Sequence, residues 1–186
     1  MTIAAKATIG SPAQQQYTAL VAELGQAIRR AVAHHADRLQ CRPGCVDCCR
    51  PFSVLAVEAA ALRAALAQLP PAPLARIRAQ ADSQEHCPFL VDKLCTVYQH
   101  RPLICRTQGL AIAYLDHDRQ AIEVSACPLN FPADEDYEFT EPDLLFMDSF
   151  NGRLAEINHD FCACEGLSPE ERIPFAAIAG QPGTSR

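Results

Sequence analysis

Apolar residues recur every three or four positions from Pro12 to about Leu39, which predicts a long amphipathic helix with one buried face. Ser11 suits the cap of this helix and Pro12 suits its first turn. His34 and His35 fall near the helix end, where we expect solvated side chains that favour the helix dipole when charged. The apolar face consists of Tyr17, Leu20, Val21, Leu24, Ile28, Ala31 and Val32.

Later segments add shorter helices and one hairpin. Val54–Gln68 is rich in alanine and leucine and predicts a second helix, which a proline-rich run ends. A short helix is expected to resume and to reach about Ala81. Leu110–Leu115 and Ala121–Ser125 flank a polar turn, which is typical of a β-hairpin. Leu144–Phe161 predicts a final helix, so the expected fold class is mainly α with a small β-hairpin.

The charge and composition exclude several classes of partner. The 186 residues carry a net charge of −6, no tryptophan and only 6% aromatic residues, which argues against a general nucleic-acid or membrane-surface binder. No apolar run approaches the roughly 20 residues that span a bilayer. The first 16 residues lack the apolar stretch of a secretory signal. We therefore expect a cytoplasmic protein with no nucleic-acid partner and no membrane partner.

Ten cysteines are the unusual feature of the composition. Secreted mini-proteins use such numbers as disulfides, but this chain is long enough for a core and shows no export signal. Clustered cysteines in a reducing compartment more often bind metal. Four of them lie within the nine residues "CRPGCVDCC", where Pro43-Gly44 predicts a turn.

Cys48 and Cys49 are adjacent, and a disulfide between neighbours would close a strained ring. Adjacent side chains tend to diverge, so we expect one thiol to bind the local centre while the other faces a second centre or a distant cysteine. Eight thiols divide into two four-thiolate sites, but they also permit one cluster plus a second metal, or one cluster with spare thiols. The eight candidate metal ligands, which we expect to converge in space, are Cys41, Cys45, Cys48, Cys49, Cys87, Cys95, Cys105 and Cys127.

The cysteine motifs follow the pattern of a known family. After the leading run come Cys87-Pro88-Phe89-Leu90, then "CTVYQHRPLICR" from Cys95 to Arg106, then Cys127-Pro128. Over about residues 41–128 the chain resembles the YkgJ-type cysteine-cluster family, described as a putative zinc- or iron-chelating domain. The resemblance implies metal binding by the cysteine cluster. One departure is the opening spacing, which is C-x3-C here and usually C-x2-C in the family.

The identity of the metal stays open, because four thiolates suit zinc and an iron–sulfur cluster equally. Cys41-x3-Cys45-x2-Cys48 also has the spacing of a radical S-adenosylmethionine loop. Asp47 stands where that loop usually has an aromatic residue, and the chain lacks the βα units of such enzymes. Basic residues are expected to offset the charge of buried thiolates. Those that flank the cysteines are Arg42, Arg50, Lys93, Arg101 and Arg106.

Other candidate ligands are weaker. His86 and His100 lie beside cysteines and are considered as replacement ligands, although we expect them to be solvated. His159, Cys162 and Cys164 form a small tract outside the family resemblance. This tract is either an auxiliary metal site or a helix end with incidental thiols.

These features divide the chain into three parts. Residues 1–11 are expected to be a disordered leader, and residues 12–165 a compact single domain organised around the metal module at about 41–128. Residues 166–186 are expected to form a C-terminal tail, mobile after Pro174. The acidic residues within 133–143 are interpreted as a solvated loop.

Two functions remain open at this point. In the first, the chain is a small metal-binding protein, structural or redox, that acts through a protein partner. In the second, it is an enzyme that uses the cluster, such as a protein-modifying methyltransferase, because a flagellin lysine N-methylase resembles the same module. No glycine-rich methyl-donor site is recognisable, and no catalytic residue is assigned.

Overall fold

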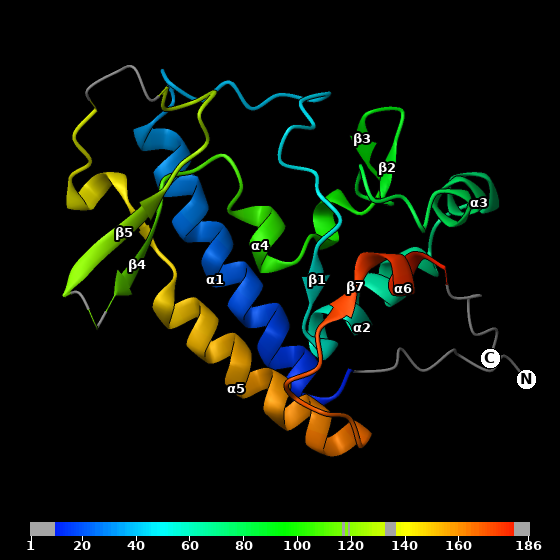
Figure 1. Cartoon of the computed structure of the whole chain (residues 1–186). Helices are drawn as coiled ribbons and strands as arrows, with labels where there is room; N and C mark the ends of the chain where they lie inside the picture. Colours follow the sequence, from blue (N-terminus) through cyan, green and yellow to red (C-terminus); the bar gives the residue numbers. More distant parts are fainter. Residues whose placement is uncertain (1–9, 117, 119, 133–136, 181–186) are drawn as a thin grey trace, which may run out of the picture.

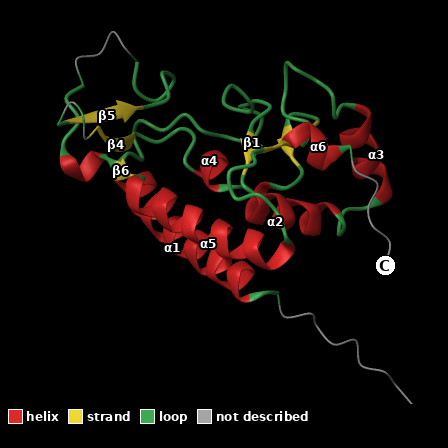
Figure 2. Ribbon diagram, turned by 60° about the horizontal axis from the view of Figure 1, so that its bottom comes forward, coloured by secondary structure: helices red, strands yellow, loops and turns green. Residues whose placement is uncertain are grey.

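Two long helices form one side of the molecule in the computed structural model, which describes residues 10–116, 118, 120–132 and 137–180. α1 (Pro12–His34) and α5 (Asp148–Glu165) lie side by side along their lengths (Figures 1 and 2). Their facing side chains form a first hydrophobic cluster, to which α2 and α4 contribute. The described part of the chain forms six helices and short strands, which confirms the expected mainly α fold.

The predicted start of α1 is confirmed. The Ser11 hydroxyl accepts a hydrogen bond from the Gln14 backbone N–H at 3.3 Å, and the Gln14 side chain accepts one from the Ser11 N–H at 2.8 Å. This reciprocal pair satisfies two N–H groups that a helix start otherwise leaves free. The helix ends at His34, earlier than the predicted Leu39, because the chain turns at His35 and buries that side chain.

The second half of the molecule is built from shorter helices. α2 (Ala56–Leu66) and α3 (Pro71–Ala79) confirm the two predicted helices around the proline-rich run. α4 (Leu103–Arg106) and α6 (Phe175–Ala179) are single turns. Together with cysteine-bearing loops, α2, α3 and α6 enclose a second hydrophobic cluster.

The strands are short, and among the described residues one pair forms a hairpin of five-residue strands. β4 (Ile112–Asp116) pairs antiparallel with β5 (Ala121–Ser125), as predicted, with Ile112 opposite Ser125. β6 (Leu145–Phe146) adds in parallel beside β4, which moves the start of α5 from the predicted Leu144 to Asp148. The other elements are β1 (Ser53–Val54), β2 (Leu90–Val91), β3 (Leu94–Cys95), β7 (Ile173–Pro174) and the 3-10 turns η1 (Tyr98–His100) and η2 (Glu141–Asp143).

The expected C-terminal tail is partly wrong, because residues 166–180 fold onto the domain. β7 pairs antiparallel with β1, and α6 buries Phe175 and Ile178 in the second cluster. The expected leader, residues 1–9, and the acidic residues 133–136 lie outside the described residues. In the described part of the chain, no helix has the length and apolar character needed to cross a membrane.

Candidate metal centre

Two turns fold the run of four cysteines between α1 and β1. The Cys45 N–H donates to the Arg42 carbonyl at 3.0 Å, and Gly44 lies at φ +92°, which confirms the turn predicted at Pro43-Gly44. A second turn follows, in which the Cys49 N–H donates to the Val46 carbonyl at 2.9 Å. The two turns keep all four cysteines within one short stretch of surface loop.

The second cysteine-bearing segment is attached directly to the first. The Cys87 N–H donates to the Cys49 carbonyl at 3.3 Å. Beyond it, β2 and β3 form a hairpin that pairs Leu90 with Cys95. Asp92 and Lys93 at the hairpin turn have φ of 52° and 62°, as a tight two-residue hairpin requires. The hairpin thus returns Cys95 to the side of the chain where Cys87 lies.

Glu58 positions the third segment, which carries Cys105 on α4. The buried Glu58 carboxylate accepts from the Leu103 N–H at 2.9 Å, at the first residue of α4, and from the Leu55 N–H at 3.3 Å. One side chain therefore caps α2 and also anchors α4. Sequence analysis did not identify Glu58, although a carboxylate within an alanine- and leucine-rich helix was a signal.

Four thiols share one environment. Cys87 is buried in the second hydrophobic cluster, and Cys49, Cys95 and Cys105 pack against it. Burial raises the pKa of Cys87 to about 12 and raises the pKa of Cys95 and of Cys105. Their charges also act on one another, since ionised Cys87, Cys95 and Cys105 each raise the pKa of Cys49. We call Cys49, Cys87, Cys95 and Cys105 the inner cysteines.

The two thiols of the doublet influence each other's ionisation. Interaction with the Cys48 thiol is the main cause that lowers the pKa of Cys49, and the same interaction is the main cause that raises the pKa of Cys48. Cys49 is therefore the more readily ionised of the pair.

The sulfurs are close but do not have the spacing of metal-bound ligands. In the described parts of the chain, which include all ten cysteines, no three sulfurs lie within 4.8 Å of one another. Four sulfurs bound to one zinc ion at about 2.3 Å would be about 3.8 Å apart. Metal binding at the inner cysteines therefore requires the loops that carry them to draw closer.

Arg101 supplies positive charge where thiolates would form. The pKa values of Cys48, Cys95 and Cys105 are raised overall, and the Arg101 charge partly offsets that rise. Its guanidinium stacks over the Tyr98 ring with 3.9 Å to the ring centroid. Its Nε is buried and has no hydrogen-bond partner among the described residues. The buried, unpaired N–H of Arg101 is suited to stabilise the negative charge of nearby thiolates.

The other predicted cations have different roles. Arg106 donates to the carbonyl oxygens of Arg101 and Gln99, at 2.5 and 2.6 Å, and so holds the backbone ahead of α4. Arg42, Arg50 and Lys93 are exposed. Arg101 is thus the flanking cation whose charge acts on three of the sulfurs, those of Cys48, Cys95 and Cys105.

Asn130 links the loop that carries Cys41 to the turn that begins at Cys127. The Asn130 side-chain amide lies 3.5 Å from the Cys41 sulfur and donates to the Gly109 carbonyl at 2.6 Å. The Asn130 backbone N–H donates to the Cys127 carbonyl at 3.0 Å. Gly109 lies at φ +95°, a backbone conformation that favours glycine, and a Cβ there would lie 2.6 Å from the Cys41 sulfur. Sequence analysis missed Asn130, since an asparagine in a loop carries no distinctive signal.

Cys45 lies near a carboxylate. Its sulfur lies 3.7 Å from a carboxylate oxygen of Asp47. With Cys41, Cys48 and Cys127 it completes the eight predicted ligands, and we call these four the outer cysteines.

The weaker candidates do not gather around the cysteines. Cys162 is buried between α1 and α5, with its sulfur 3.7 Å from the Ser168 carbonyl, while Cys164 and His159 are exposed on α5. The three do not form a metal-binding group within the described residues. His86 is also exposed.

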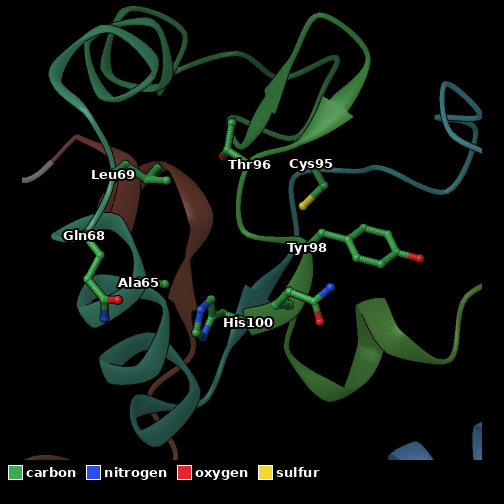
Figure 3. A pocket seen from close by; sticks show the side chains of 8 residues that line it. Ala65, Gln68, Leu69, Cys95, Thr96, Tyr98 and His100 are labelled. Carbon is green, nitrogen blue, oxygen red and sulfur yellow. The ribbon is translucent and has the colours of Figure 1, made fainter.

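A surface pocket of about 250 Å³ opens beside Cys95. Figure 3 shows Cys95, Tyr98 and His100 on one side of it and Gln68 and Leu69, which follow α2, on the other. The pocket brings solvent next to one inner cysteine, so this side of the cluster is accessible from outside.

Comparison with protein families gives one match. Residues 40–128 match the model of the family CxxCxxCC, described as "Putative zinc- or iron-chelating domain". No curated protein and no solved structure matches the chain. The match covers the cysteine-bearing segment, from the residue before Cys41 to the residue after Cys127, and it supports metal binding by this part of the molecule. Over residues 40–128, just under half of its length, the chain is therefore similar to the CxxCxxCC family, described as a zinc- or iron-chelating domain.

Proposed function

We propose that this protein binds zinc or an iron–sulfur cluster through its inner cysteines and has a structural or redox role. The observation that carries this proposal is the shared environment of Cys49, Cys87, Cys95 and Cys105. They come from three segments of the chain, pack on one hydrophobic cluster and influence one another's ionisation. Four cysteines are the usual ligand set of structural zinc and of iron–sulfur clusters.

The outer cysteines are proposed to hold a second centre. Support comes from Asn130, which contacts the Cys41 sulfur and the Cys127 backbone, and from the position of Cys48 beside Cys49. The doublet would then lie where the two centres adjoin, with Cys49 in one ligand set and Cys48 in the other.

The chain itself supplies the charge balance and the dry surroundings. Zinc would contribute structural cross-linking, and an iron–sulfur cluster would contribute electron transfer. Thiols with raised pKa values are protonated at neutral pH, so binding at the inner cysteines must release protons. Arg101 and its unpaired Nε–H would stabilise the thiolates that remain.

We further propose that the protein works in a reducing compartment such as the cytoplasm. All ten cysteines are described, and each is a free thiol. Free thiols at this density persist only where disulfides do not form.

The decisive experiment is anaerobic purification followed by elemental analysis and a visible absorption spectrum. Bound zinc without colour would assign a zinc protein, and iron with sulfide and a broad visible absorption would assign a cluster. Cys105→Ser should remove about one centre, while Cys164→Ser, which changes an exposed thiol on α5, should retain the wild-type metal content. Absence of both metals from protein purified anaerobically with added zinc or iron would overturn the proposal.

Proton release gives an independent measure of the ligand set. When zinc is titrated into metal-free protein in weak buffer at neutral pH, we expect about three to four protons to be released for each ion bound at the inner cysteines. The lower end of that range reflects Cys49, whose pKa is lowered by the Cys48 thiol. Release of one proton or none would show that these thiols are not the ligands.

A further inference from the structure

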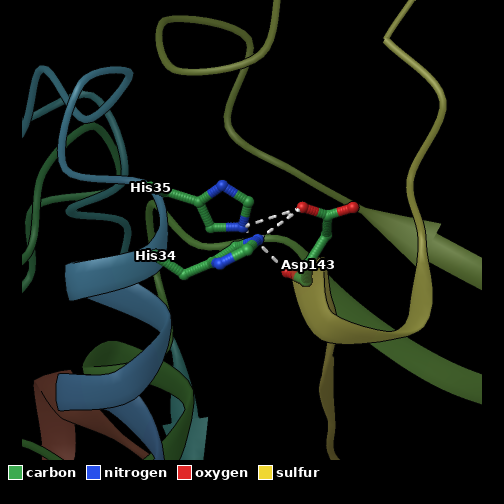
Figure 4. Close-up of side chains that lie close together, drawn as sticks. All are labelled: His34, His35 and Asp143. Atoms are coloured by element: carbon green, nitrogen blue, oxygen red, sulfur yellow. Dashed lines mark hydrogen bonds and ion pairs between the residues drawn. The ribbon is translucent and has the colours of Figure 1, made fainter.

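A second group of metal-binding side chains lies outside the family-matched segment. His34 and His35, at the end of α1, meet Asp143 of η2 (Figure 4). Nε2 of His34 lies 3.0 Å from Asp143 Oδ1, and Nε2 of His35 lies 4.0 Å from the same oxygen. One ligand atom from each residue lies within 4.8 Å of the other two.

We propose that His34, His35 and Asp143 bind a divalent first-row metal ion in a two-histidine, one-carboxylate site that is separate from the cysteines. Imidazole nitrogen and carboxylate oxygen suit ions such as Zn²⁺, Fe²⁺ or Co²⁺, whereas the cysteines form a purely sulfur site. With bonds of about 2.0–2.2 Å, neighbouring ligand atoms lie about 3–3.5 Å apart. The observed separations of 3.0 and 4.0 Å need only a small rotation of the rings to match.

The carboxylate is already held in place. Asp143 Oδ2 accepts hydrogen bonds from the Thr140 N–H at 2.6 Å and the Thr140 hydroxyl at 2.7 Å, and Oδ1 accepts one from the Tyr137 hydroxyl at 2.7 Å. These donors hold the pKa of Asp143 well below its usual range. The carboxylate is therefore ionised at neutral pH, and hydrogen bonds to a ligand in this way orient it for a metal.

The two imidazoles differ in a way that suits metal capture. His35 is 2% exposed, and its ring packs edge-on against Phe131 with centroids 5.1 Å apart. The side chain of His34 is 48% exposed, so solvent reaches the site from its side and can fill the remaining coordination positions. One ligand is therefore fixed by packing while the other is free to adjust.

Metal binding requires one proton to move. Nε2 of His35 lies 2.9 Å from the Asp143 backbone carbonyl, which only accepts, so this nitrogen carries the proton in the metal-free form. When Nε2 binds an ion, the proton must reside on Nδ1 instead. The competing interpretation is a hydrogen-bonded latch that joins the end of α1 to η2 and never binds metal, and the experiment must separate the two.

The test uses the full chain with its cysteine centre already loaded, and Co²⁺ as the probe. Bound Co²⁺ is counted by equilibrium dialysis, while the sulfur-to-metal absorption reports separately on the cysteines. We expect wild type to bind about one additional ion without a new sulfur absorption. His34→Gln and His35→Asn should bind it at least tenfold more weakly, and His159→Gln, an exposed histidine on α5, should behave as wild type.

Three outcomes would overturn the proposal. They are no additional ion in wild type, equal affinity in His34→Gln, and additional cobalt that is bound with growing sulfur absorption. Because the His34 side chain is half exposed, we expect its substitution to leave the fold intact, and an unchanged sulfur absorption in the variant verifies this. Because the cysteine signal is read independently, failure here leaves the proposed function of the cysteines untouched.

Discussion

Glu58 and Asn130 are buried polar residues that position cysteines without having thiols of their own. Glu58 joins the start of α2 to the start of α4, and Asn130 joins residues around Cys41, Gly109 and Cys127. Buried polar groups are stable only when their hydrogen bonds are satisfied. Each therefore fixes the mutual placement of segments that are far apart in the sequence.

Glu58→Gln should make the stability of the protein less dependent on pH. Burial raises the folded-state pKa of Glu58 above its unfolded value of about 4.3. Its contribution is complete below that value and is lost as pH rises through the folded-state pKa. Glutamine never ionises but has one acceptor oxygen for two N–H donors, at a cost of about 1 kcal/mol. The free energy of unfolding by which wild type exceeds the variant should thus shrink as the pH rises above about 4.

Urea unfolding at several pH values measures this difference. Glu156→Gln, which changes an exposed carboxylate on α5, is the control and should leave the pH profile unchanged. A constant gap between wild type and Glu58→Gln across the range would contradict the argument.

Cys48→Ser and Cys49→Ser should each lower the metal content by about one centre, from different sites. The two neighbouring thiols differ in ionisation, and one ion rarely captures adjacent side chains without strain. The double variant should therefore lose more metal than either single variant. Metal-to-protein ratios measure this, with Cys164→Ser as the control for loss of an exposed thiol. If one single change leaves the ratio intact, the doublet serves a single centre.

At the scale of single residues, the sequence predicts which side chains could bind metal better than it predicts which side chains are buried. The cysteines were identifiable because their density and spacing are distinctive. The burial of His35 and Asp143 could not be predicted, because the sequence pattern indicated a solvated helix end and a solvated acidic loop. Both are buried because the chain turns at His35 and brings η2 against the end of α1, a contact across more than 100 residues.

Elements with strong local signals were predicted closely. α1 begins where serine and proline indicate, and the β4–β5 hairpin follows the alternation around its polar turn. The two-residue strands were not predictable, because two residues carry no periodicity. The C-terminal segment was misjudged for the same reason: α6 is one turn long, and its burial depends on aromatic partners elsewhere in the chain.

Phe175→Ala should destabilise the protein by about 3–5 kcal/mol, because it leaves a cavity in the second hydrophobic cluster. Phe175 is 1% exposed, and its ring centroid lies 5.0 Å from Phe89 and 6.3 Å from Phe52. Both partners belong to cysteine-bearing loops, so metal affinity should fall as well. Leu167→Ala, at a site 46% exposed, is the matched control. A change below about 1 kcal/mol in chemical denaturation would show that α6 contributes little.

The molecule contains two hydrophobic clusters, one enclosed by long helices and the other by short helices and loops. The first lies between the two long helices α1 and α5, of which α1 begins with a capping box. The second is enclosed by short helices and by the loops that carry the inner cysteines. Loops with few regular backbone hydrogen bonds depend on other constraints, and a metal centre is the constraint that the family match supports.

Removing the metal should therefore weaken one half of the molecule before the other. In thiolate sites the binding free energy becomes folding free energy, and even ~5 kcal/mol would shift the melting temperature of a protein this size by about 10–20 °C. We expect a strong chelator to lower the midpoint by that order. Hydrogen exchange should show lost protection in residues 41–54 and 87–106, while the amides of α1 and α5 keep most of theirs. An unchanged midpoint with metal demonstrably removed would refute the link between binding and folding. Equal loss of protection in α1 and α5 would instead show that the two clusters unfold as one unit.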